Sequence, residues 1–325
     1  MVNVLVVGGA GYIGAHTCLD LHSKGFTPVV YDNFSRGHEG AVLWGPSERG
    51  DLADERRLDE VFAKYQPAAV VHFAALIEVG ESTRDPLAFF ENNVAGTISL
   101  LKSARRAGCE KIVFSSTCAT YGDPVRVPMD EDHPQAPLNP YGRSKLMVEF
   151  ILRDLSTYHD TRSVILRYFN AAGADPEARI GERHDPETHA IPLAIDAALG
   201  RRADFKIFGT DYDTRDGTCI RDFVHVMDLA DAHSRAVQYL VDGGASTALN
   251  LGTGRGTSVR ELLGEIAAVS GRPFPVTETE RRVGDAPALV ADNSRARETL
   301  GWEIRHDLPS IIRTAWRWHT STNAG

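Results

Sequence analysis

Two side chains four positions apart, those of Tyr141 and Lys145, are the best suited in this chain to moving a proton. In a helix this spacing places the phenol and the ammonium on one face, about one turn from each other. A neighbouring ammonium favours the charged phenolate and so lowers the pKa of tyrosine from its usual value of about 10. The pair therefore predicts a general base that acts near neutral pH, as the oxidation of an alcohol carbon requires.

A glycine-rich run upstream has the context that a dinucleotide site needs. Gly8, Gly11 and Gly14 directly follow the short apolar run Val4–Val7 and open a helix-like segment. Glycines there allow a tight turn and the close approach of a pyrophosphate to the amides of a helix N-terminus. Asp32 follows the next apolar run, eighteen residues after Gly14. A carboxylate at this position accepts hydrogen bonds from ribose hydroxyls and repels a 2′-phosphate. The sequence therefore predicts NAD rather than NADP.

Short apolar runs alternate with helix-like segments through the first half of the chain. Uninterrupted apolar strands that alternate with helices are typical of a parallel sheet covered on both faces. We expect a Rossmann-type, doubly wound α/β domain over residues 1–170 that binds NAD. Residues 171–325 are interpreted as a smaller α+β substrate-binding domain, whose elements could interleave with the first. The runs are Val4–Val7, Thr27–Tyr31, Ala69–Phe73, Ile112–Ser115 and Val164–Leu166, and the helix-like segments are Tyr12–Lys24, Asp54–Tyr65, Leu87–Ala107 and Tyr141–Tyr158.

Thr117 stands at the end of the run that begins at Ile112, and Asp51 stands where a further strand, the third of the sheet domain, is expected to end. In an open parallel sheet, ligands bind beyond the carboxyl ends of the strands. Thr117 is therefore expected to place a hydroxyl at the same rim as the glycine loop, facing the helix that carries Tyr141. Asp51 follows Gly50 and either contacts an adenine or is an ordinary loop aspartate; both interpretations stay open.

The composition disfavours several classes of function. The 325 residues include 35 Lys and Arg against 44 Asp and Glu, a formal net charge of −9, which disfavours nucleic-acid binding. Four cysteines are scattered, which predicts free thiols in a reducing compartment, and His184 and His189 have a poor metal spacing for a helix, so we expect no metal. No signal peptide is visible, and the longest apolar stretch, residues 68–77, is too short to span a bilayer. We expect a cytoplasmic protein without membrane contact.

Several runs of the chain together resemble one enzyme family. Residues 8–14 (Gly-Gly-Ala-Gly-Tyr-Ile-Gly), 72–74 (His-Phe-Ala) and 141–145 (Tyr-Gly-Arg-Ser-Lys) are similar to those of extended short-chain dehydrogenase/reductases, the NAD-dependent epimerase/dehydratase family. Residues 167–170 (Arg-Tyr-Phe-Asn) and 221–226 (Arg-Asp-Phe-Val-His-Val) narrow the resemblance to the UDP-glucose 4-epimerases and their closest relatives. The resemblance runs the length of the chain.

What the resemblance implies is a redox-neutral reaction, the reversible C4 epimerisation of UDP-glucose and UDP-galactose through a 4-keto sugar, with tightly bound NAD. Tyr141 would take the proton of the 4-hydroxyl, and Thr117 would hydrogen-bond that oxygen. Lys145 would also hold the nicotinamide ribose. Homodimers are common in the family, so a homodimer is expected on that ground.

The resemblance also implies which residues hold each ligand. The two guanidinium groups of the substrate set would clamp the diphosphate, which reconciles an acidic chain with an anionic substrate. The residues expected to bind NAD are Gly8, Gly11, Tyr12, Ile13, Gly14, Asp32, Asn33, Asp51, Leu52, Phe73, Ala74, Ala75, Asn92, Ser115, Tyr141, Lys145 and Tyr168. The residues expected to bind the UDP-sugar are Thr117, Tyr141, Asn170, His189, Phe208, Arg221, Arg282, Asp285 and Leu289.

Departures from the family pattern leave the sugar open. Ile77 stands where a lysine is frequent, and Leu289 is intermediate between the large and small residues associated with excluding or admitting an N-acetyl group. Residues 115–121 also resemble epimerases that act on UDP-xylose and UDP-arabinose, so UDP-pentoses and UDP-N-acetylhexosamines are alternative substrates. A sugar-nucleotide dehydratase would need an acid and a base where Cys118 and Ala119 stand. A non-catalytic NAD-binding sensor would typically lack the Tyr–Lys pair.

Overall fold

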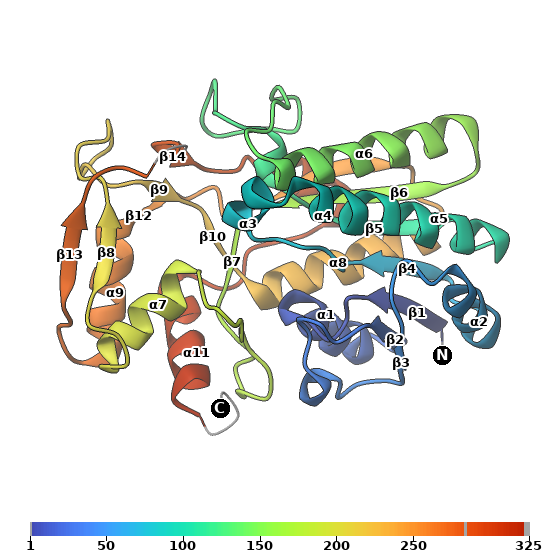
Figure 1. Ribbon diagram of the computed structural model, residues 1–325, viewed down its shortest axis with the longest axis horizontal. Helices are drawn as coiled ribbons and strands as arrows, with labels where there is room; N and C mark the ends of the chain where they lie inside the picture. Colours follow the sequence, from blue (N-terminus) through green and yellow to red (C-terminus); the bar gives the residue numbers. More distant parts are fainter. Residues whose placement is uncertain (1, 283–284, 322–325) are drawn as a thin grey trace.

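Seven parallel strands form one sheet in the larger part of the molecule (Figure 1). The structure is a computed structural model that describes residues 2–282 and 285–321. The strand order reverses between β1 and β4, so a crevice for a ligand is expected beyond their carboxyl ends. Across the sheet the strands are β11 (Thr247–Leu251), β6 (Arg162–Tyr168), β5 (Lys111–Thr117), β4 (Ala69–His72), β1 (Val2–Val7), β2 (Phe26–Asp32) and β3 (Ser47–Arg49).

Helices cover both faces of this sheet, because successive strand side chains point to opposite sides and the buried ones at the centre of the sheet are mostly apolar. Two separate apolar cores result, one on each face. The predicted doubly wound α/β fold is thereby confirmed. One face carries α1 (Tyr12–Ser23), α8 (Val226–Val241) and α10 (Ser294–Leu300), and the other carries α2 (Glu55–Tyr65), α5 (Gly96–Arg106) and α6 (Pro140–Tyr158).

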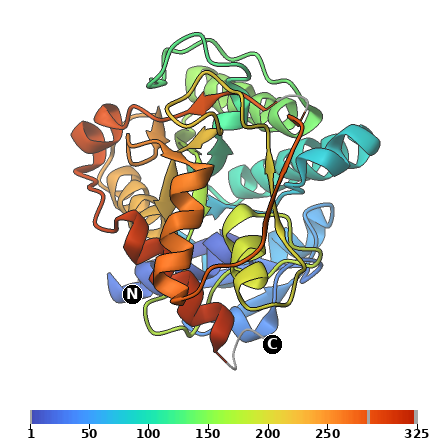
Figure 2. The same ribbon diagram turned by 90° about the vertical axis from the view of Figure 1, so that its left-hand side faces the viewer.

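A smaller group of elements lies at the left of Figure 1 and faces the viewer in Figure 2. Its three helices, α7 (Ala190–Ala198), α9 (Val259–Ser270) and α11 (Leu308–Thr320), share a third apolar core. Its strands form three small sheets instead of extending the large one. These are β7 (Asn170–Ala172) with β10 (Phe223–His225), β8 (Phe205–Phe208) with β13 (Val276–Thr279), and β9 (Ile220–Arg221) between β12 (Thr257–Ser258) and β14 (Ala288–Leu289).

The large sheet crosses the boundary expected at residue 170. Strand β11 pairs with β6, and helix α8 packs on the sheet beside α1, although both come from the later part of the chain. A division into an NAD-binding unit and a UDP-sugar-binding unit stays a prediction, with β11 and α8 on the NAD-binding side. Among the residues described, no helix is both long and apolar enough to cross a membrane.

One predicted helix is interrupted at a position that matters for the site. The pattern predicts a single helix over Leu87–Ala107, whereas the structure has α4 (Pro86–Phe90), a π-helical turn η2 (Glu91–Ala95) and then α5. A π turn rotates the side chains that follow it and is frequent at functional sites. Here Asn92 lines the cavity described below, while Asn93 is buried and hydrogen-bonds both backbone groups of Leu76. The short helix α3 (Val79–Arg84) precedes this segment.

Candidate active site

A cavity of about 970 Å³ opens beyond the carboxyl ends of the central strands, between the large sheet and the smaller group of elements. Its wall includes every predicted site residue except Ser115, Lys145 and Leu289. The fold therefore brings the glycine loop, the proposed proton-moving groups and the proposed UDP-binding groups to one space. Ile77, the first departure from the family pattern, also lines it.

The loop between β1 and α1 has no room for a side chain at two of its glycines. Gly8 has a φ of +81°, and a Cβ atom there would lie 2.5 Å from the backbone nitrogen of Ala74. A Cβ atom on Gly14 would lie 2.3 Å from the carbonyl oxygen of Gly8. No side chain caps the start of α1 behind this loop, so its first amides can receive an anion. These residues fit the pyrophosphate of a dinucleotide.

The carboxylate of Asp32 braces the glycine loop from the end of β2. Its two oxygens accept hydrogen bonds from the backbone amides of Ala10 at 3.0 Å and Phe34 at 2.8 Å. Burial raises the pKa of this carboxyl, and both amides oppose the rise. Because a carboxylate accepts about four hydrogen bonds, Asp32 keeps capacity for ribose hydroxyls in the cavity.

Asn33, Asp51 and Leu52 form the far wall at this end. The amide of Asn33 donates to the carboxylate of Asp51 at 2.8 Å, and the phenol of Tyr31 donates to the carbonyl oxygen of Asp51, also at 2.8 Å. Asp51 is thus both a cavity residue and a loop-stabilising residue. Both interpretations of this residue remain open.

Helix α6 begins where its sequence supplies a cap. The side chain of Asn139 accepts a hydrogen bond from the amide of Gly142 at 2.9 Å, and Pro140 occupies the first turn. Tyr141 therefore lies in the first turn of α6, in the cavity wall together with Thr117 of β5. Because Asn139 and Pro140 fix where the helix starts, they also fix where the Tyr141 phenol lies.

Lys145 and Ser115 lie directly behind this wall. The ammonium of Lys145, a residue only 4% exposed, donates to the carbonyl oxygen of Ser115 at 3.0 Å. The hydroxyl of Ser115 in turn hydrogen-bonds the phenol of Tyr168, which does line the cavity. Ser115 thus couples the lysine to a cavity residue.

Burial dominates the proton affinities of the Tyr–Lys pair. It raises the pKa of Tyr141 well above its usual value, with a further rise from the Tyr168 phenol and an opposing effect from the Thr117 hydroxyl. Burial also lowers the pKa of Lys145 to about 7. The spacing predicts a Tyr141 pKa lowered by Lys145, whereas in the folded chain this pKa is raised, because burial of the phenol is the largest influence on it.

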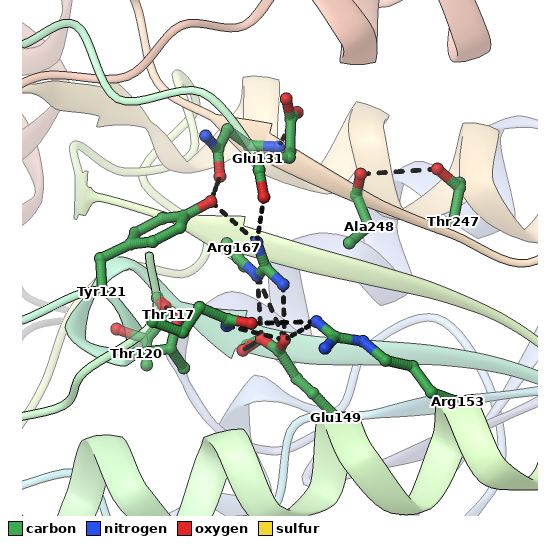
Figure 3. A network of polar contacts seen from close by, with 12 residues as sticks. Thr117, Thr120, Tyr121, Glu131, Glu149, Arg153, Arg167, Thr247 and Ala248 are labelled. Atoms are coloured by element: carbon green, nitrogen blue, oxygen red, sulfur yellow. Dashed lines mark hydrogen bonds and ion pairs between the residues drawn. The ribbon is translucent and has the colours of Figure 1, made fainter. Parts of the chain in front are cut away.

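A buried ion pair that the sequence reasoning missed joins helix α6 to strand β6 (Figure 3). Glu149, about two turns beyond Tyr141 on α6, pairs with Arg167 of β6 at 2.7 Å, and their side chains are 0% and 1% exposed. Ser116 of β5 donates to the same carboxylate at 2.6 Å, so α6, β5 and β6 meet at one point. Arg167 also donates to the phenol of Tyr121 at 2.9 Å. A carboxylate on the apolar face of a predicted helix was the available signal for this pair.

Two guanidinium groups line the opposite end of the cavity. Arg282 lies over the ring of Phe208, 4.2 Å from its centroid, in a cation–π contact. Arg221 donates to the carbonyl oxygen of Ala286 at 2.8 Å and lies 3.4 Å from the carboxylate of Asp285. Two arginines with an aromatic ring beside them suit a nucleoside diphosphate.

Asn170 and Leu289 differ in their relation to the cavity. The amide of Asn170 lines it and donates to the carbonyl oxygen of Asp222 at 3.2 Å. Leu289 is half-buried and lies in a small apolar cluster outside the wall. Any effect of Leu289 on the sugar must therefore pass through that cluster, which contains Cys118, Tyr121, Met129, Phe169 and Ala291.

Four titratable side chains converge in the loop between β7 and α7. The ligating atoms of Glu182, His184, Glu187 and His189 all lie within 4.8 Å of one another. The predicted absence of a metal rests on helical spacing, which does not apply because this segment is a loop. Burial alone would lower the pKa of His189, but its hydrogen bonds with Glu182 and Glu187 raise it to about 10. His189, expected to contact the substrate, lines the cavity.

Comparison with known proteins agrees with this geometry. A sequence profile of the NAD dependent epimerase/dehydratase family matches residues 4–252, more than half of the chain. The chain belongs to the NAD dependent epimerase/dehydratase family. The family predicted from the sequence motifs is confirmed.

Members of the NAD dependent epimerase/dehydratase family are similar to this chain over nearly its whole length. The UDP-glucose 4-epimerase of Rhizobium leguminosarum bv. trifolii is 66% identical over 320 residues, which are 98% of each chain. The UDP-glucose 4-epimerase of Brucella ovis, solved in complex with NAD, is 53% identical with a TM-score of 0.95, and the match covers 97% of this chain and 98% of that one. The enzyme of Stenotrophomonas maltophila, solved with NAD and formylated UDP-arabinopyranose, is 40% identical with a TM-score of 0.96, and the match covers 98% of both chains.

Proposed function

We propose that this chain is an NAD-dependent isomerase that interconverts UDP-glucose and UDP-galactose by reversible epimerisation at C4 of the sugar. The observation that carries the proposal is one cavity with a dinucleotide cradle at one end and two arginines at the other. Tyr141 and Thr117 line the same cavity. The UDP-glucose 4-epimerase that is 66% identical to this chain supports the same reaction.

Tyr141 and Thr117 are the groups that would handle the proton. Bound NAD supplies the hydride acceptor and donor of this chemistry. In our proposal the phenolate form of Tyr141 accepts the proton of the sugar 4-hydroxyl and returns it when the 4-keto sugar is reduced, and the Thr117 hydroxyl hydrogen-bonds the same sugar oxygen. Burial makes the Tyr141 phenolate costly, and the ammonium of Lys145, held behind the cavity wall by the carbonyl oxygen of Ser115, would supply positive charge that favours it. The 4-keto sugar then turns over within the cavity before its C4 is reduced from the other face.

The UDP end would hold the substrate while the sugar turns. Arg221 and Arg282 would bind the diphosphate through charge-assisted hydrogen bonds, and Phe208 would pack on the uracil. Asn170 and Asp285 would contact the phosphate–sugar and ribose regions. Since these groups bind the part of the substrate that does not react, they can stay engaged in both orientations of the sugar.

Epimerisation of UDP-xylose and UDP-arabinose is a second candidate function. It is favoured by the relative that was solved with formylated UDP-arabinopyranose. A dehydratase is disfavoured, because the residues after Thr117 are Cys118 and Ala119, which supply neither the acid nor the base of a water elimination.

The test is a substrate panel. Purified protein is incubated with UDP-glucose, UDP-galactose, UDP-xylose, UDP-arabinose and UDP-N-acetylglucosamine, and kcat/KM is measured for each. We expect the hexose pair to be interconverted fastest, and Tyr141→Phe to lose about 10²–10⁴-fold in kcat while retaining NAD. Preferred turnover of the pentoses would replace the proposal with the second candidate. Full activity of Tyr141→Phe would remove Tyr141 as the base.

We also propose that the chain forms a homodimer in the cytoplasm. Helix α6 leaves Met147 and Phe150 44% and 52% exposed, and Ile98 of the neighbouring α5 is 36% exposed, so an apolar surface is available for a second copy. All four cysteines are free thiols, which agrees with a reducing compartment. Size-exclusion chromatography with light scattering measures the molar mass of the protein in solution. A monomeric mass at micromolar concentration would contradict the dimer.

A further inference from the structure

The loop between β7 and α7 gathers two imidazoles and two carboxylates around one point. The Nδ1 atom of His189 lies 3.0 Å from Glu182 Oε1 and 3.0 Å from Glu187 Oε1. The Nδ1 atom of His184 lies 3.3 Å from Glu182 Oε1 and 3.7 Å from Glu187 Oε2. Each of the four side chains contributes one ligating atom to this group. His184 and His189 both lie in the loop and not on a helix.

These separations suit a small tetrahedral cation. Bonds of about 2.0–2.1 Å from a tetrahedral metal to nitrogen and oxygen place the ligand atoms about 3.3 Å apart. The four nitrogen–oxygen separations, 3.0 to 3.7 Å, bracket that value, with Glu187 facing His189 through Oε1 and His184 through Oε2, and one ligating atom from each of the four side chains lies within 4.8 Å of the others. The Nδ1 atom of His184 is also buried and makes no hydrogen bond, and it faces the carboxylates of Glu182 and Glu187 at 3.3 and 3.7 Å.

The two carboxylates of this group carry two negative charges that need compensation. Glu182 is only 5% exposed, and Glu187 lies beside it. Within residues 2–282 and 285–321, no lysine or arginine forms an ion pair with either carboxylate; their charged partners are His184 and His189. Buried carboxylates without compensation are costly. Two protonated imidazoles or one divalent cation would each balance them.

We propose that Glu182, His184, Glu187 and His189 form a binding site for one divalent transition-metal ion of the zinc class. Two imidazoles and two carboxylates are ligand types that zinc and cobalt accept in tetrahedral sites. The ion would tie the loop to the start of α7, because His189 directly precedes that helix. It would also fix the loop against the NAD-binding part, since the ring of Tyr12 packs edge-on against His184 at 6.4 Å. The role is the positioning of a cavity wall, and it holds for any of the candidate sugars.

Cobalt(II) is the probe, because tetrahedral cobalt gives intense visible bands and octahedral cobalt gives weak ones. Full-length protein is dialysed against a chelator and titrated with cobalt chloride, with visible absorption and the melting temperature as readouts. We expect tetrahedral bands that saturate at one equivalent and a melting temperature that rises with the metal concentration. Zinc chloride should displace the cobalt and abolish the bands.

Two substitutions in this group distinguish a bound metal ion from two imidazolium–carboxylate ion pairs. Glu187→Gln keeps an oxygen that can accept the hydrogen bonds from the backbone amides of Thr188 and His189, but it removes the negative charge. His184→Ala removes the nitrogen that has no hydrogen-bond partner, and each substitution should weaken cobalt binding by at least about 100-fold. The control is His159→Ala, an exposed histidine at the end of α6 whose ring contacts Arg105, which should bind cobalt normally.

Correct folding of each variant is checked by its circular dichroism and its retained NAD. The proposal is overturned if the wild type shows no saturable tetrahedral bands. It is also overturned if both Glu187→Gln and His184→Ala bind cobalt as tightly as the wild type. In either case the loop is held by two imidazolium–carboxylate pairs.

Discussion

The two proposed ligand-binding ends of the cavity are built by different means. The dinucleotide end is built mainly from backbone, with Gly8 and Gly14 clearing space and Asp32 bracing the loop, all within one strand–helix–strand unit. The opposite end is built from side chains on separate elements, with Phe208 on β8, Arg221 on β9 and Arg282 after β13. A local stretch of sequence therefore sets the first end, and long-range packing sets the second.

This difference predicts how each end tolerates substitution. A backbone cradle fails when any side chain enters it, because the close contacts are with main-chain atoms that cannot move aside. A side-chain clamp loses affinity in steps, one group at a time, and leaves the fold intact. The proposed substitutions below run from the largest expected effect to the smallest.

Gly14→Ala should abolish NAD binding at the dinucleotide end. The added Cβ atom would lie 2.3 Å from the Gly8 carbonyl oxygen, which forces the loop open and displaces the pyrophosphate site. We expect purified protein without NAD and an activity at least about 100-fold lower. Released NAD is measured after acid treatment. Gly264→Ala, in a helix with nothing within 4 Å of its Cβ, is the matched control and should keep both. Normal NAD content in Gly14→Ala would show that the cradle is not rigid.

Glu149→Gln tests the buried ion pair between α6 and β6. It leaves the buried Arg167 without its counter-charge, and breaking such a pair costs about 3–5 kcal/mol. Urea denaturation should show this as a lower midpoint with an unchanged slope. Arg153→Ala removes the exposed partner of the same carboxylate and should cost less than about 1 kcal/mol. Equal effects of the two substitutions would argue that Arg167 does not depend on Glu149.

Arg282→Ala should weaken substrate binding and spare the cofactor. Loss of one charge-assisted contact costs about 1.5–3 kcal/mol, so KM for the UDP-sugar should rise about tenfold to hundredfold with NAD content unchanged. The neighbouring Arg281, which pairs with Asp211 outside the cavity, provides the control Arg281→Ala. A similar KM in both variants would remove Arg282 from the clamp.

Asp32→Asn should have the smallest effect, a loss of cofactor selectivity, because its amide oxygen can still accept a hydrogen bond from the glycine loop. Without the carboxylate, the repulsion of a 2′-phosphate disappears, and discrimination against NADP should fall about tenfold, which corresponds to about 1.4 kcal/mol. Binding of NAD and NADP to protein freed of its cofactor measures this directly. Unchanged selectivity would mean that other groups at this end choose the cofactor.

The parts that the sequence predicts well are those with a local code. The alternation of apolar runs with helix-like segments predicts five of the seven strands of the large sheet, and the strand expected before Asp51 is a sixth. Each of these predictions uses only residues that are close together in the sequence. The glycine loop and the helix predicted over Tyr141–Tyr158 are equally local. The π turn at Glu91–Ala95 is not, because the apolar periodicity on either side of it fits an ordinary helix.

The parts that the sequence leaves out depend on contacts between distant residues. Glu149 and Arg167 belong to different elements of the chain, and the sequence around either residue does not indicate that the other will neutralise its charge. The five-residue spacing of His184 and His189 argues against a metal only on a helix. The Tyr141 pKa is raised because the folded chain buries the phenol, an effect that spacing cannot contain.

The pairing of β11 with β6 also bears on how the chain is made. The last strand of the large sheet ends at residue 251, so a nascent chain must be synthesised through that residue before the sheet can close. Until then β6 presents an unpaired edge, and the apolar face that α8 later covers is exposed on the ribosome. A fragment that stops at residue 170 would carry this edge permanently and should aggregate, whereas the full chain conceals it as soon as β11 emerges.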